Sequence, residues 1–171
     1  MRIYLTGFMG SGKSHVGQAL AELIQFPFVD LDAVIEQAEQ QAISNIFETR
    51  GEDAFRRLEQ EHLQRTIRQT DVVVATGGGT VCFYDNLRWI KQYGMLIYLD
   101  APVAILTERL KSETQHRPLL AKLSSDELPI YIEEKLRNRR AFYEQADVIY
   151  ELRAAREDVA KQLATALRFV T

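Results

Sequence analysis

The segment from Gly7 to Ser14 has the residue types and the spacing of a phosphate-binding loop. Its sequence, Gly-Phe-Met-Gly-Ser-Gly-Lys-Ser, matches the pattern G-x-x-x-x-G-K-[ST]. Glycines let backbone N–H groups close around phosphates, and the N-terminus of the next helix adds partial positive charge. We expect Lys13 to reach the β- and γ-phosphates of a nucleotide and the Ser14 hydroxyl to ligate Mg²⁺. Within the loop, the other expected nucleotide contacts are Gly10, Ser11 and Gly12.

Two carboxylates, Asp30 and Asp32, follow the next apolar segment. At positions i and i+2 at a strand end, both can face the same side. Phosphoryl transfer needs one carboxylate near Mg²⁺ and another near the attacking hydroxyl, and this pair could supply both. The alternative is that Asp32 only caps a helix that begins at Ala33.

Arg56 and Glu59 have the i, i+3 spacing of neighbours on one helix face. Spacing alone favours a solvated ion pair, which contributes only ~0.3–0.5 kcal/mol. The functional alternative is an arginine that Glu59 steadies and that binds an anionic substrate, since a guanidinium pairs with a carboxylate through two hydrogen bonds.

Three further segments have both a functional and a structural interpretation. Gly77-Gly78-Gly79 fits either a close approach of another molecule to the backbone or a flexible turn. The polar stretch at 112–124 fits a lid whose Arg117 closes on the phosphates, or a solvent loop. The basic segment Arg137-Asn138-Arg139-Arg140, near a helix end, either complements the helix dipole or supplies an arginine that holds the same anion as Arg56.

The elements that must position these residues alternate along the chain. We predict strands at 2–6, 28–31, 71–76, 95–99 and 148–150, and helices at 16–24, 52–68, 102–111 and from about 157. This alternation is typical of an α/β protein with a parallel sheet covered on both faces. Ligands of such sheets bind beyond the carboxyl ends of the strands, where the phosphate loop, the aspartates and the triple glycine all fall.

The composition limits the class of protein. A chain of 171 residues, with 46% apolar and 26% charged residues, is long enough for a single domain with its own core. A net charge of −3 argues against a general nucleic-acid or membrane binder. With Cys82 as the only cysteine, no internal disulfide can form. The sequence shows neither a signal peptide nor a membrane span, so we expect a cytoplasmic protein, with a monomer as the default.

Taken together, these motifs resemble the shikimate kinase family. The likeness runs from Arg2 to about Val148 and includes the phosphate loop, Asp30-Leu31-Asp32, Ile46-Phe47 with the segment 51–59, the triple glycine, Arg117-Pro118-Leu119-Leu120, and more loosely Arg139 with Tyr143. It implies a three-layer P-loop kinase fold with a five-stranded parallel sheet. It also implies a substrate-binding helical segment at about 32–60 and a mobile lid at about 112–124. The implied reaction is ATP-dependent phosphorylation of the shikimate 3-hydroxyl, in the route to aromatic amino acids.

The resemblance also implies a role for each residue. Asp32 would contact the reacting hydroxyl and act in catalysis with Lys13 and Arg117, while Asp30 and Ser14 would belong to the Mg²⁺ sphere. Arg56 and Arg139 would hold the shikimate carboxylate, and Glu59 would orient Arg56. The remaining contacts implied for shikimate come from Gly77, Gly78 and Gly79 through the backbone and from Phe47 and Phe55 as walls of the pocket.

The chain departs from the family at two places. His15 stands where the family usually has threonine, and we expect it to affect nucleotide contact or local packing. Arg156 stands where the family often has proline before the last helix, in the segment where Arg153 is expected near the adenine. Two other functions remain open at this point: a kinase for a sugar acid such as gluconate, and a nucleotide-binding module without catalysis.

Overall fold

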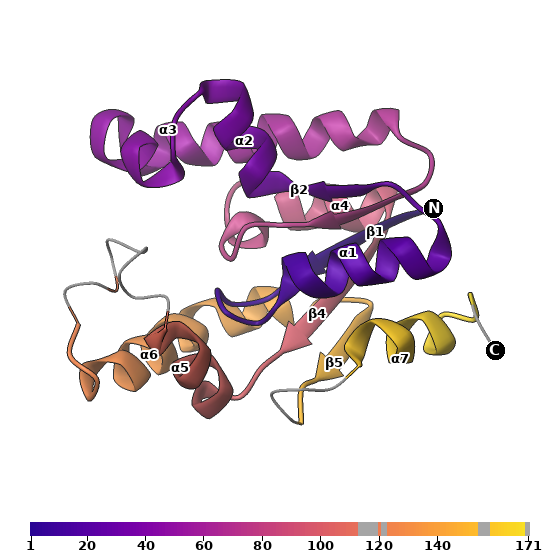
Figure 1. Cartoon of the computed structure of the whole chain (residues 1–171). Helices are drawn as coiled ribbons and strands as arrows, with labels where there is room; N and C mark the ends of the chain where they lie inside the picture. Colours follow the sequence, from indigo (N-terminus) through magenta and orange to yellow (C-terminus); the bar gives the residue numbers. More distant parts are fainter. Residues whose placement is uncertain (113–119, 121–122, 154–157, 170–171) are drawn as a thin grey trace.

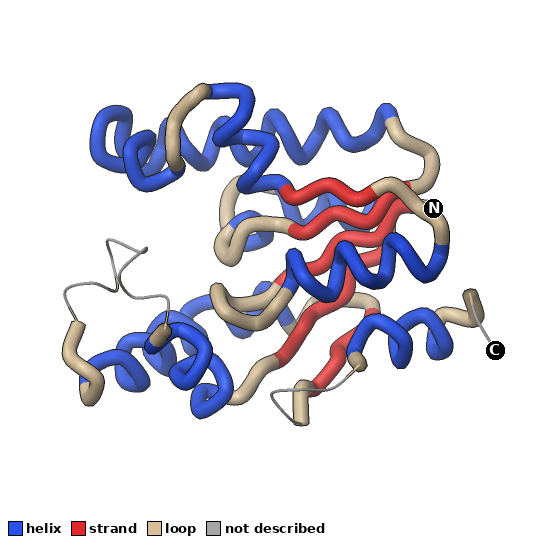
Figure 2. Tube along the Cα trace, viewed as in Figure 1, coloured by secondary structure: helices blue, strands red, loops and turns tan. Residues whose placement is uncertain are grey.

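Five parallel strands form one sheet in the order β2-β3-β1-β4-β5 (Figures 1 and 2). The computed structural model describes residues 1–112, 120, 123–153 and 158–169. The strands are β1 (Arg2–Thr6), β2 (Phe28–Asp30), β3 (Val72–Ala75), β4 (Met95–Asp100) and β5 (Val148–Glu151). The helices are α1 (Lys13–Ile24), α2 (Leu31–Glu39), α3 (Ile43–Arg65), α4 (Asn86–Tyr93), α5 (Val103–Lys111), α6 (Glu127–Tyr143) and α7 (Val159–Ala166), with 3₁₀ turns η1 (Thr66–Arg68) and η2 (Thr80–Cys82).

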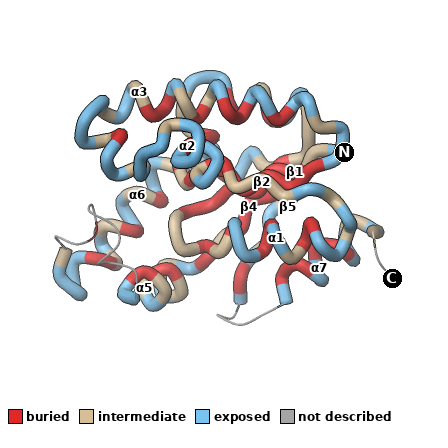
Figure 3. Tube along the Cα trace, turned by 45° about the horizontal axis from the view of Figure 1, so that its top comes forward, coloured by how far each residue is buried: buried red, intermediate tan, exposed pale blue. Residues whose placement is uncertain are grey.

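The place of each strand in the sheet follows from its apolar content. The four residues of β3 are all buried, as expected for a strand covered on both faces. The edge strands β2 and β5 are half-buried or alternately exposed. Figure 3 shows that buried residues concentrate in the central strands and on the inward sides of the helices.

Adjacent residues of β1 show how helices cover the two faces of the sheet. The Tyr4 ring packs edge-on against Trp89 of α4, and its hydroxyl hydrogen-bonds to Thr66. Leu5 points the other way, because a Cβ placed on Gly17 of α1 would lie 3.1 Å from its side chain. Helices α1 and α7 lie side by side over this second face (Figure 1). The result is the three-layer α/β arrangement with five parallel strands that the sequence predicts.

The helix boundaries differ from the sequence prediction in three places. The long helix α3 begins at Ile43 rather than at Glu52, and Gly51 interrupts it with φ 82° and ψ 169°. Its last turn, Thr66–Arg68, is 3₁₀ rather than α-helical. In addition, the structure has a helix of eight residues at Asn86–Tyr93, where none was predicted.

Most of the candidate lid lies outside the described residues, since 113–119 and 121–122, including Arg117, are not among them. Among the helices that the structure describes, none is both long and apolar enough to cross a membrane.

Candidate active site

The phosphate loop connects β1 to α1 at the carboxyl edge of the sheet. Gly12, the residue that precedes α1, has φ 93°, a left-handed conformation that an L side chain rarely adopts. Lys13 opens the helix, and its Nζ donates hydrogen bonds to the carbonyls of Gly7 (2.9 Å) and Phe8 (3.0 Å). The ammonium group is therefore held against the loop, where nucleotide phosphates bind in loops of this type. Arg109 of α5 also reaches the loop, with Nη1 3.0 Å from the Gly10 carbonyl.

Ser14 and Asp30 bring two oxygen ligands together beside this loop. Ser14 Oγ donates a 2.5 Å hydrogen bond to Asp30 Oδ2, while Asp30 Oδ1 accepts from the backbone N–H of Ala33 at 3.2 Å. Asp30 is thus the residue that caps α2, which begins at Leu31. The interpretation of Asp32 as the cap of a helix beginning at Ala33 is wrong, because Asp32 lies inside the first turn.

The Asp32 carboxylate therefore does not cap α2. Its Oδ1 is buried and has no hydrogen-bond partner among the described residues. Burial, followed by the nearby Glu59 carboxylate, raises the pKa of Asp32 to about 6, against an opposing effect of Lys13. A buried carboxylate with an unused acceptor and a pKa near neutrality has the properties of a general base.

Arg56 and Glu59 form a buried ion pair rather than a solvated one. Arg56 is 7% exposed and Glu59 is 0% exposed, and Nη1 of the arginine lies 2.5 Å from Glu59 Oε2. Glu52, which is mostly exposed, accepts from Nε (3.2 Å) and Nη2 (3.0 Å). Burial disfavours the charge of Arg56, but the two glutamates more than offset this effect and raise its pKa. The surface interpretation, which spacing alone favours, is therefore wrong.

Aromatic rings surround the Arg56 guanidinium. Its carbon lies 4.1 Å from the ring centre of Phe83, 5.2 Å from that of Phe55 and 5.8 Å from that of Phe47. The Phe47 and Phe55 rings also contact each other, with centres 4.7 Å apart. An arginine held in this way presents its charge in a largely dry environment, where it is attracted to the ring faces. Phe83 is not among the predicted site residues, although its place four residues after the triple glycine was a possible signal.

The triple glycine brings the two candidate anion-binding arginines to one turn. A Cβ on Gly79 would lie 2.9 Å from Arg56 Nη2, so a side chain at this position would have to displace the guanidinium. The carbonyl of the preceding residue, Gly78, accepts hydrogen bonds from Arg139 Nη1 (3.2 Å) and from the Tyr143 hydroxyl. Arg139 therefore points to the sheet rim and does more than complement the dipole of α6.

The same turn faces both the phosphate loop and Asp32. A Cβ on Gly78 would lie 3.3 Å from the backbone nitrogen of Met9, and one on Gly77 would lie 2.9 Å from Asp32 Oδ1. The Gly77 position would also meet Glu59. Two positive groups, one candidate base and a phosphate-binding loop thus surround one small region of the rim.

Two predicted residues lie on the surface. His15 is exposed in the first turn of α1, and Arg153 is exposed just after β5. The contact of Arg109 with the phosphate loop was not predicted, since nothing in the sequence indicates which face of α5 turns toward the loop.

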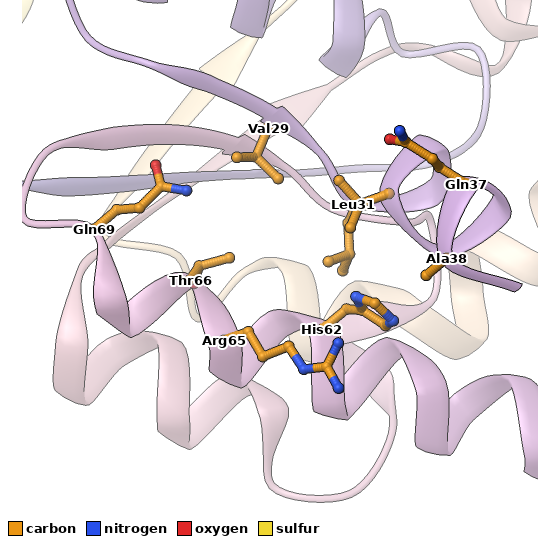
Figure 4. A pocket seen from close by; sticks show the side chains of 9 residues that line it. Val29, Leu31, Gln37, Ala38, His62, Arg65, Thr66 and Gln69 are labelled. Carbon is orange, nitrogen blue, oxygen red and sulfur yellow. The ribbon is translucent and has the colours of Figure 1, made fainter.

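A separate pocket of about 360 Å³ lies between β2, α2 and α3 (Figure 4). One of its lining residues, Leu31, stands between Asp30 and Asp32 in the chain. His62 lines it, and burial followed by the charge of Arg65 lowers the pKa of this histidine. The lining residues are Val29, Leu31, Val34, Gln37, Ala38, His62, Arg65, Thr66 and Gln69.

The fold and the site define the class of protein: a P-loop kinase, with a phosphate loop after β1 and an acceptor region over β2 and β3. The sequence of the chain identifies the family within this class. A family model described as shikimate kinase matches residues 9–168, and the chain belongs to the shikimate kinase family.

Relatives and solved structures agree with this assignment. A shikimate kinase of Bacteroides fragilis is 41% identical over 150 residues, which cover 88% of this chain and 84% of the relative. The crystal structure of shikimate kinase from Bacteroides thetaiotaomicron superposes with a TM-score of 0.92 at 36% identity, covering 98% of each chain. A shikimate kinase from Acinetobacter baumannii, solved in complex with shikimate, gives 0.88 at 34% identity, covering 98% of this chain and 93% of that one.

Proposed function

We propose that this chain transfers the γ-phosphoryl group of ATP to the 3-hydroxyl of shikimate, giving shikimate 3-phosphate and ADP on the route to aromatic amino acids. The observation that carries the proposal is the convergence of Arg56 and Arg139 on the glycine turn beside the phosphate loop. A small substrate with a carboxylate and a nearby hydroxyl complements these charges. The solved relative with bound shikimate supports this choice of acid.

Each substrate group has a complementary protein group in the proposal. Arg56 and Arg139 hold the carboxylate, and Glu59 orients Arg56 through their 2.5 Å hydrogen bond. Backbone groups of Gly77, Gly78 and Gly79 contact the ring, and Phe47 and Phe55 wall the pocket. Burying a charged acid requires such partners, because an unpaired charge would lose its hydration without compensation.

Asp32 is proposed as the group that accepts the proton of the 3-hydroxyl. Its unpartnered Oδ1 supplies the acceptor, and the pKa near 6 leaves it mostly ionised at pH 7. Proton transfer to such a base contributes typically ~10²–10⁴-fold to the rate.

The nucleotide side of the site fits ATP with Mg²⁺. Ser14 Oγ and Asp30 Oδ2, 2.5 Å apart, are the oxygen donors that Mg²⁺ prefers, and they would hold it together with water. The ion would offset negative charge on the phosphoryl group. Lys13, with the loop residues 10–12, would hold the phosphates. Arg117 from the lid, His15 and Arg153 are proposed as further nucleotide contacts on the resemblance alone.

A coupled assay of ATP consumption tests the proposal against a sugar-acid kinase. We expect turnover with shikimate, little or none with gluconate, loss of activity in EDTA and recovery with Mg²⁺. Turnover on gluconate with none on shikimate would contradict the proposal. ATP binding without turnover on either acid would instead favour a non-catalytic nucleotide-binding module.

A further inference from the structure

Thr80, the first residue of η2, is linked to the substrate-binding arginine through Glu59. Its side chain is fully buried, and Oγ1 donates a 2.6 Å hydrogen bond to Glu59 Oε1. The other oxygen of Glu59 accepts from Arg56 at 2.5 Å. One carboxylate thus receives a hydroxyl from the glycine turn and a guanidinium from α3, and neither oxygen is exposed to water because Glu59 is 0% exposed.

Thr80 is itself held in place by its backbone. Its N–H donates to the Gly77 carbonyl at 3.3 Å, and its carbonyl accepts from Asn86 Nδ2 at 2.9 Å. Asn86, at the start of α4, is 1% exposed. The hydroxyl of Thr80 is therefore a fixed donor rather than a freely rotating surface group.

The turn at 77–80 consequently sets the positions of both arginines. Arg139 is hydrogen-bonded to the Gly78 carbonyl, while Arg56 is connected to Thr80 through Glu59. A carboxylate that binds between two guanidinium groups depends on the separation of those groups. Without the Thr80 hydroxyl, Arg56 would lose its hydrogen-bonded connection to the turn that holds Arg139.

The negative charge of Asp32 repels the Glu59 carboxylate, so a hydrogen bond from Thr80 is needed to hold Glu59 in place. Asp32 and Glu59 both approach the Gly77 backbone, so their carboxylates are close. A hydrogen bond from Thr80 holds Glu59 in the orientation that pairs with Arg56. The second partner of Arg56, Glu52, cannot replace this restraint, because its side chain is 56% exposed.

We infer that Thr80 is a positioning residue for the substrate carboxylate, acting through Glu59 on Arg56 without touching the substrate. The inference rests on the proposed function, and it assigns a specific part of shikimate binding to the buried Thr80 hydroxyl.

Three variants of the full chain test this inference: Thr80→Val, which removes the hydroxyl at nearly constant volume, Thr80→Ala as a second deletion, and Thr80→Ser as the matched control. We expect Thr80→Val and Thr80→Ala to raise the KM for shikimate roughly tenfold, the effect of losing one charge-assisted hydrogen bond. The KM for ATP and kcat should change by less than about twofold. Thr80→Ser should restore the shikimate KM.

A double variant separates action through Glu59 from a general loss of structure. In a Glu59→Gln background, Thr80→Val should add little to the shikimate KM, because the two residues act as one unit. Thr80→Val kinetics equal to wild type, failure of Thr80→Ser to restore KM, or full multiplication of the two effects would overturn the inference. Absence of shikimate turnover by the wild-type chain would overturn the proposed function and this inference with it.

Discussion

The burial of Asp32 favours its role in catalysis but opposes the ionisation of its carboxylate. Its buried, unpartnered oxygen suits proton abstraction, but the same burial disfavours its charge. Asp30, two residues earlier, caps α2 and binds Ser14, so the neighbouring carboxylates have separate tasks.

Replacing Asp32 by Asn should therefore affect chemistry rather than nucleotide binding. We predict that Asp32→Asn lowers kcat by ~10²-fold or more, because the amide cannot accept the hydroxyl proton. The Kd for ATP, measured by calorimetry, should stay within about threefold, since the substitution leaves the hydrogen bonds from Lys13 to the Gly7 and Phe8 carbonyls in place. Turnover close to that of wild type would remove Asp32 from the mechanism.

The pH dependence of activity follows from the same carboxyl group. A base must be ionised, so kcat/KM for shikimate should fall as the pH decreases through about 6, the pKa of Asp32. An unperturbed aspartate would instead hold activity down to about pH 4. Steady-state rates between pH 4.5 and 8 distinguish these profiles, and a flat profile down to pH 5 would contradict the assignment.

At the scale of elements, the glycine turn and α3 together shape the substrate site. Gly79 has φ −110°, which any residue adopts, yet a Cβ there would approach Arg56 Nη2 to 2.9 Å. Gly79→Ala should therefore displace the arginine without straining the backbone. We predict a loss of roughly ten- to a hundredfold in kcat/KM for shikimate, with little change in the free energy of unfolding.

At Gly51, unlike Gly79, the backbone conformation and not the available space disfavours a side chain. A Cβ there would meet no atom within 4 Å, but the backbone has φ 82° and ψ 169°, a region nearly restricted to glycine. Gly51→Ala should lower the free energy of unfolding by about 1–3 kcal/mol, measured by urea denaturation. If it destabilises no more than Gly79→Ala does, the kink in α3 is not a strained element.

The sequence predicted the central strands but not the burial of site residues, and this difference has physical causes. The apolar runs of β1, β3 and β4 marked buried strands, because a strand covered on both faces needs no polar alternation. Spacing could not tell whether the Arg56–Glu59 pair is buried, since burial depends on how α3 packs on the sheet. The contacts of Phe83 and Arg109 with the site are tertiary, and the sequence indicates at most that Phe83 follows the triple glycine.

At the scale of the whole molecule, the buried Asp32 carboxylate should lower the free energy of unfolding at neutral pH. The pKa of Asp32 is about 6 in the folded protein and 3.8 for an ordinary aspartate, so the folded state binds the proton more tightly. The stabilisation from this proton is complete below about pH 4 and is lost as the pH rises through 6. Above that pH, the ionised group opposes folding.

Asp32→Asn should consequently be more stable than wild type at pH 8, by on the order of 1–3 kcal/mol, and the gain should disappear near pH 4. Urea denaturation of both proteins at several pH values gives the difference directly. Lower stability of the variant at pH 8 would show that the carboxylate contributes to the fold.

The most direct test of the account is a crystal structure of this chain with shikimate and ADP. We predict that the acid lies against the turn at 77–79, with its carboxylate bound by Arg56 and Arg139 and its 3-hydroxyl beside Asp32. A carboxylate bound away from both arginines, or a hydroxyl that faces away from Asp32, would contradict it.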